Sequence, residues 1–114
     1  MLKNFSFFGA PYTAVVTTDR DLDTYGAVDC GAYVNTLMLL IQNAGLGVIA
    51  QGAVAMYSDF VRSWLQLPDD PLVVCAVSFG HADTTAEVND FRTTRADLTS
   101  VLTHVSSTPS RIQE

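Results

Sequence analysis

The sequence predicts an α+β domain, of the kind in which helices and a small sheet form three layers, α/β/α. Two segments of strand-forming residues, Tyr12–Thr18 and Leu72–Gly80, enclose two stretches with helical spacing. Hydrophobic residues make up 48% of the 114 residues and charged residues 16%, a balance that supports a core and excludes a disordered chain. We expect one domain over residues 1–114.

The charge of the chain excludes two classes of partner. The formal net charge is -6, the pI is about 4.5 and only six residues are Lys or Arg. A nucleic-acid partner requires a basic face, and an anionic membrane surface attracts basic segments. No apolar run is long enough to span a bilayer, and Met1–Asn4 opens no signal peptide. We therefore expect a cytoplasmic protein without a nucleic-acid or membrane partner.

The first predicted strand, Tyr12–Thr18, is mostly apolar, and we expect it to be buried on both faces. It ends at Asp19–Asp23, which we expect to be a solvated loop. The next segment, Ala27–Ala44, is predicted to be the strongest helix. Its apolar residues cover most of the circumference, which is typical of an interior or interface helix. They are Val28, Ala32, Val34, Leu37, Met38, Leu39, Leu40, Ile41 and Ala44.

Gly45 is well placed as the left-handed residue that ends this helix. Gly45–Gln51 then predicts an extended segment, and Val54–Gln66 predicts a second helix. Ser58 and Asp59 are placed to cap a restart within this helix. We expect Trp64, on this helix, to pack in the core.

A turn at Pro68–Pro71 separates the second helix from a second buried strand, Leu72–Gly80. We expect a polar loop over His81–Arg95, a short helix over Asp97–Val105 and a mobile tail over Ser106–Glu114.

Four residues with reactive side chains are not expected to be catalytic. Cys30 and Cys75 have no metal-type spacing, and we expect them to be buried, reduced structural residues. His81 and His104 are expected to be structural or solvated. We therefore predict no catalytic side chain and no metal site.

Five segments resemble, in the right order, segments of the FMN-dependent nitroreductase family. They are Phe7–Pro11, Asp29–Ala32 with Asn43–Gly47, Val61–Asp70, Val77–Asp83 and Asn89–Arg95. The resemblance covers about Phe5–Leu102 and implies a nitroreductase-like α+β fold. It also implies an intertwined homodimer with FMN at the subunit interface. NADH or NADPH would reduce the FMN, which would then reduce nitroaromatics, quinones or similar small acceptors.

The chain also departs from that family. The family's N-terminal Arg-x-Ser-x-Arg segment, which grips the flavin, has no match here, so we expect a truncated, C-terminal half of the fold. Ala50 stands where many members have proline. A non-catalytic remnant or dimerisation module is therefore an alternative to an enzyme. In a third possibility, a separate polypeptide supplies the other half.

The resemblance implies that Arg92 and Arg95 bind the FMN phosphate. Such a dianion requires Arg or Lys, and arginine makes bidentate contacts. From their spacing alone, the alternative is that these are solvated arginines paired with Glu87, Asp90 or Asp97.

The second predicted part of the flavin site is Ala50, Gln51, Gly52 and Ala53, between an extended segment and a helix. Small residues let a ligand approach the backbone, and amides at a helix start point outward as donors. We expect a backbone amide near flavin N5, with Gln51 beside the ring. The alternative is an ordinary turn from strand to helix.

Overall fold

The computed structural model describes residues 2–105 and divides the chain into two compact units, Met1–Asp83 and Thr84–Glu114. Each unit is described by itself. The prediction of one domain over the chain stays a prediction, and the prediction for Ser106–Glu114 lies outside the described residues.

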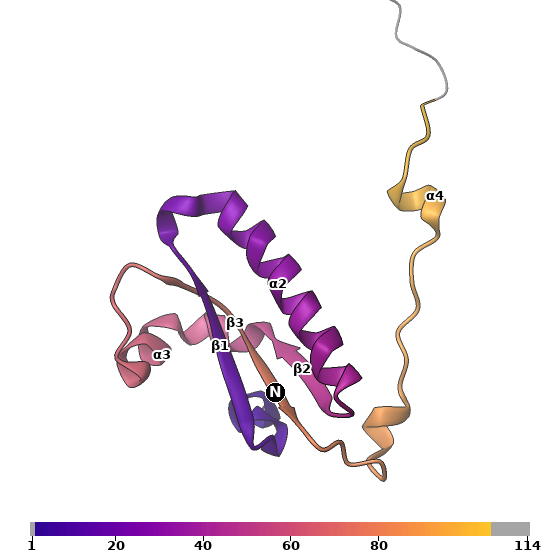
Figure 1. Cartoon of the computed structure of the whole chain (residues 1–114), viewed down its shortest axis with the longest axis horizontal. Helices are drawn as coiled ribbons and strands as arrows, with labels where there is room; N and C mark the ends of the chain where they lie inside the picture. The colour runs from indigo at the N-terminus through magenta and orange to yellow at the C-terminus, as the bar shows by residue number, and fades with distance from the viewer. Residues whose placement is uncertain (1, 106–114) are drawn as a thin grey trace, which may run out of the picture. The chain divides into compact units, whose positions relative to one another are not determined.

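The first unit is built on a three-stranded antiparallel sheet with the strand order β1-β3-β2 (Figure 1). The strands are β1 (Tyr12–Thr18), β2 (Gly47–Gln51) and β3 (Leu72–Gly80), and the predicted bounds of β1 and β3 are confirmed. The central strand β3 pairs with both neighbours, while β1 and β2 do not pair with each other. All hydrogen bonding within this sheet therefore passes through β3.

The long helix α2 (Asp23–Asn43) covers one face of the sheet. Its buried residues Cys30 and Ile41 form a core cluster with residues of β1 and β3. The helix begins four residues before the predicted start, with Asp23 in its first turn, where a carboxylate is stabilised. Gly45 has φ +80°, as predicted for the residue that ends the helix.

The opposite face carries the 3-10 helix η3 (Gly52–Tyr57) and the α-helix α3 (Ser58–Leu65). Val54 of η3 and Val61 of α3 form a second core cluster with Val73 and Ala76 of β3. A helix restart is present at Ser58, where the helix type changes, but the predicted cap by Ser58 or Asp59 is wrong, because the N-cap residue is Tyr57 and no side chain caps the helix. The predicted three-layer α/β/α arrangement is therefore present in this unit.

The N-terminal segment lies on this second face as well. It contains the helix α1 (Leu2–Phe5) and the 3-10 turn η1 (Phe7–Gly9). The ring of Phe5 meets that of Tyr57 edge to face, with centroids 5.1 Å apart. Phe7 is half-buried against the second core cluster.

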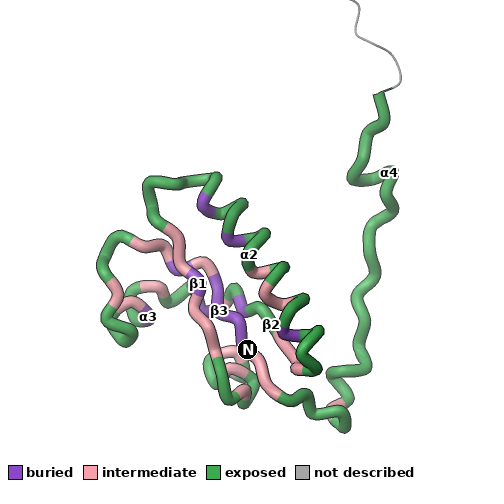
Figure 2. Tube along the Cα trace, in the orientation of Figure 1, coloured by how far each residue is buried: buried purple, intermediate pink, exposed green. Residues whose placement is uncertain are grey.

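Two burial predictions are wrong. Only Val16 of β1 is buried, because β1 is an edge strand with a single neighbour (Figure 2). Trp64 is 68% exposed, because α3 buries only Val61 against the sheet. By contrast, Asp19 and the 3-10 helix η2 (Arg20–Leu22) are exposed, so the predicted solvated loop is confirmed as far as Leu22, while Asp23 begins α2.

The second unit contains little regular structure in its described part. Its elements are the 3-10 turn η4 (Glu87–Asp90) and the single helical turn α4 (Leu98–Val101). The predicted helix over Asp97–Val105 is therefore too long. All described residues of this unit except Ala86 are exposed, so no buried face stabilises a longer helix.

None of the helices within residues 2–105 combines the length and the apolar character that a membrane crossing requires.

A close contact between Gly80 and Pro11 gives a test of this packing. A Cβ added at Gly80 would lie 2.5 Å from Cδ of the rigid Pro11 ring. Gly80→Ala is therefore expected to lower the free energy of unfolding by about 1–3 kcal/mol in urea denaturation. The control is Gly31→Ala in α2, whose Cβ would meet nothing within 4 Å. It is expected to raise the free energy of unfolding by about 0.5–1 kcal/mol. Equal free energies of unfolding for the two variants would contradict the close contact between Gly80 and Pro11.

Candidate functional site

The bend from Ala50 to Ala53 joins the edge strand β2 to η3. Ala50 and Gly52 are exposed and Ala53 is half-buried. A Cβ added at Gly52 would meet nothing within 4 Å, so the space beside this residue is open. The backbone of the bend can therefore be approached from outside the unit, as the small side chains predict.

Gln51 lies on the inner side of this bend. Its side chain is buried, and both ends of its amide are bonded to protein groups. Nε2 donates to the carbonyl oxygen of Asn4 over 2.8 Å, and Oε1 accepts a hydrogen bond from the hydroxyl of Ser78. In this conformation the side chain supports the bend from within. Its place beside a flavin ring stays a prediction.

Ser78 connects this contact to the far edge of the sheet. Its Oγ is 3.0 Å from Oγ1 of Thr13, the residue paired with it on β1. A serine hydroxyl has one proton to donate. Because that proton goes to Gln51, Thr13 donates to Ser78. A row of polar side chains therefore crosses all three strands.

Sequence reasoning missed Ser78 and Thr13 as parts of this site. The available signal was a polar residue within an apolar run, since Ser78 follows six residues of β3 that are all apolar. A buried hydroxyl at such a position requires a partner, and here the partners are Gln51 and Thr13.

Arg92 and Arg95 lie in the exposed second unit. Nη1 of Arg92 donates to the carbonyls of Asn89 and Phe91, and Nη1 of Arg95 donates to the Thr93 hydroxyl and to the Thr94 carbonyl. The bend and the two arginines belong to different units, so their meeting at one ligand stays a prediction.

The alternative pairing of these arginines does not occur in residues 2–105. Neither arginine forms a salt bridge with Glu87, Asp90 or Asp97 in that range.

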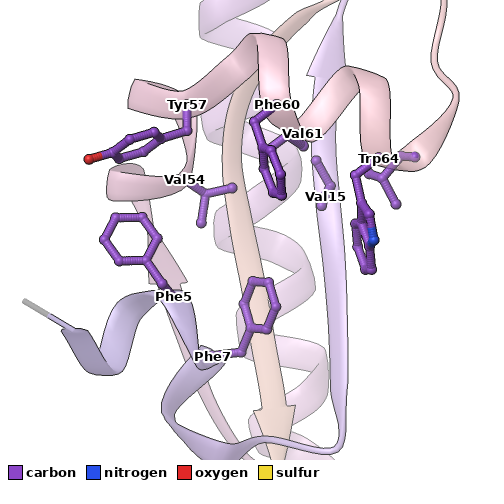
Figure 3. A pocket seen from close by; sticks show the side chains of 9 residues that line it. Phe5, Phe7, Val15, Val54, Tyr57, Phe60, Val61 and Trp64 are labelled. Carbon is purple, nitrogen blue, oxygen red and sulfur yellow. The ribbon is translucent and has the colours of Figure 1, made fainter.

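An apolar cavity of about 620 Å³ opens on the η3 and α3 face of the first unit (Figure 3). Side chains from the N-terminal segment and from η3 and α3 surround it. Its aromatic lining residues are Phe5, Phe7, Tyr57, Phe60 and Trp64. Trp64, which was predicted to pack in the core, therefore lines an open cavity.

The two cysteines are buried, as predicted. Burial raises the pKa of the Cys75 thiol, and the nearby Cys30 raises this pKa further. The Cys30 thiol points toward the carbonyl of Thr17, with 3.9 Å between sulfur and oxygen. A buried thiol held in its neutral form is a poor nucleophile. His81 and His104 are both exposed.

Comparisons with known proteins agree on one family. A sequence model of the nitroreductase family matches residues 1–81. The 4-nitrobenzoate reductase of Pseudomonas putida is 38% identical over 92 residues, which are 81% of this chain and 40% of that protein. The chloronitrobenzene nitroreductase of Comamonas testosteroni is 33% identical over 103 residues, which are 90% of this chain and 45% of that protein.

A solved structure gives the same result for the fold. The FMN-dependent nitroreductase NfnB from Mycobacterium smegmatis, in complex with NADPH, superposes with a TM-score of 0.84 at 32% identity. The match covers 90% of this chain and 46% of that structure. The chain thus spans less than half the length of these three proteins.

Proposed function

The chain belongs to the nitroreductase family, and from this premise we propose that it takes part in the FMN-dependent reduction of small acceptors by NADH or NADPH. The acceptors proposed are nitroaromatics, quinones or similar compounds. The observation that carries the proposal is the open bend at Ala50–Ala53, whose backbone is accessible beside Gly52. The two sequence relatives, a 4-nitrobenzoate reductase and a chloronitrobenzene nitroreductase, support the substrate class.

The residues of the chain fit FMN in their donor chemistry. Arg92 and Arg95 would hold the phosphate, and a guanidinium carries five N–H donors, more than the local bonds use. At the bend, a backbone amide would donate toward the flavin ring, and small side chains would leave room for it. When bound, FMN supplies the redox chemistry, so the chain contributes binding and orientation.

We further propose that two copies of the chain pair through α2. Large apolar side chains of this helix remain exposed to solvent. They are Tyr25, Val28, Tyr33, Leu39 and Leu40. An exposed apolar patch of this kind is typical of an association surface. Two-fold dimers, in which the same surface of each copy meets its counterpart, are the commonest homo-oligomers.

The test is FMN uptake by the purified chain. We expect flavin absorbance to remain with the protein after gel filtration. In the presence of the complex, we expect NADPH to be oxidised and 4-nitrobenzoate to accept its electrons. Riboflavin, which lacks the phosphate, is the matched control and is expected to bind more weakly. A chain that retains no FMN at high concentration would contradict the proposal. That result would favour the non-catalytic module or a flavin site completed by a separate polypeptide.

A further inference from the structure

We propose that Ser78 is a positioning residue that holds the bend at Ala50–Ala53 in place through the side chain of Gln51. This inference rests on the proposed function, since it assigns the bend a conformation suited to a ligand. It extends the site to three residues outside the bend: Ser78, Thr13 and Asn4.

The first argument is the completeness of the hydrogen bonding. Gln51 and Ser78 are 2% and 1% exposed, and neither has a buried polar atom without a partner. The donors run in one direction, from Thr13 to Ser78, from Ser78 to Oε1 of Gln51, and from Nε2 of Gln51 to the Asn4 carbonyl. Each bond fixes the orientation of the next group, so the amide of Gln51 has a single favoured position.

The second argument is the place of Gln51 in the chain. It is the last residue of β2 and the residue immediately before η3. Gly52 follows directly, and glycine has the widest backbone freedom of any residue. Without an anchored neighbour, the backbone at the start of η3 would be poorly fixed. The buried side chain of Gln51 supplies that anchor.

The third argument is that both hydrogen-bond partners of the Gln51 side chain, Ser78 and Asn4, belong to packed structure. Ser78 lies on the central strand β3, beside Val77, which is fully buried. Asn4 lies in α1, which contacts η3 again through the rings of Phe5 and Tyr57. The bend is therefore held from the sheet on one side and from the N-terminal segment on the other.

The experiment compares Ser78→Ala with Val77→Ala. The second variant removes buried apolar volume from the same strand and leaves the polar row intact. Peptide-resolved hydrogen exchange is measured without flavin. We expect peptides within residues 47–57 to exchange about ten-fold faster in Ser78→Ala, because Oε1 of Gln51 loses its partner, and to change less in Val77→Ala. Thr13→Val, at the sheet edge, is the milder second variant and is expected to change the same peptides about three-fold.

Binding of FMN gives the second measurement. Ser78→Ala is expected to weaken FMN binding about five-fold and to alter the visible spectrum of the bound flavin, while Val77→Ala leaves the spectrum unchanged. Equal exchange of residues 47–57 in both variants would overturn the positioning role. If Ser78→Ala speeds exchange of residues 47–57 but leaves the flavin spectrum and the FMN affinity unchanged, the link between Ser78 and the flavin is overturned. If the unaltered chain binds no FMN, the proposed function fails, and the exchange data alone decide whether Ser78 positions the bend.

Discussion

Replacing Arg92 and Arg95 together by alanine is expected to weaken FMN binding by about 100-fold or more. Each arginine would make charged hydrogen bonds to the phosphate, which are worth about 1.5–3 kcal/mol each, and 1.4 kcal/mol corresponds to a factor of ten. Riboflavin binding should change little, since riboflavin has no phosphate. Fluorescence titration of both flavins, at low and high salt, measures the effect. The loss should be larger at low salt, where charge interactions are less screened.

The matched control for this prediction is Arg62→Ala. It removes the same charge from the first unit, where Arg62 pairs with Asp59 and donates to the Pro71 carbonyl over 3.4 Å. FMN affinity should change little in this variant. Equal losses for FMN and riboflavin in the double variant, or no loss for either, would show that the two arginines do not bind the phosphate.

Placing glutamate at both Leu39 and Leu40 is expected to convert a dimer of this chain into monomers. These side chains are 59% and 62% exposed on α2. Burying a leucine contributes about 1.5–3 kcal/mol, and the change alters four leucines in a symmetric dimer. The dissociation constant should therefore rise by at least about 1,000-fold, which sedimentation velocity over a concentration series would measure.

The control places the same charges on the opposite face of the sheet. Phe60→Glu with Trp64→Glu changes two apolar residues of α3 that are 69% and 68% exposed. This variant should remain a dimer if α2 forms the interface. Pairing through α2 would be refuted if the unaltered chain is monomeric at high concentration. It would also be refuted if the α3 changes alone dissociate the dimer.

Local patterns were sufficient to predict most elements of the fold. The apolar runs at Tyr12–Thr18 and Leu72–Gly80 define two strands, and Gly45 marks the end of α2. Burial was harder to predict, because it depends on the order of the strands. Nothing within Tyr12–Thr18 reveals that this strand lies at an edge. The Trp64 error has a similar origin, since spacing alone does not reveal how narrow the buried stripe of α3 is.

The candidate site was predictable only in its local part. The small residues of the bend are consecutive, and a sequence pattern can identify them. The bonds that hold the bend join Gln51 to Ser78, 27 residues away, and to Asn4, 47 residues away. Such contacts depend on strand order and register, and no short segment of the sequence determines either. The hydrogen bonds of Arg92 and Arg95 to local carbonyls also depend on the backbone course after Asn89.

The central position of β3 has a consequence for how the protein folds during its synthesis. Strands β1 and β2 pair only with β3, which is the last strand of the unit to be synthesised. While a ribosome is still making Leu72–Gly80, the two earlier strands have no template to join, whereas α2 can form from local contacts alone. The nascent chain therefore carries a helix with exposed apolar residues before it has any sheet to cover. This stage is when a chaperone, or another copy of the chain, would meet that surface.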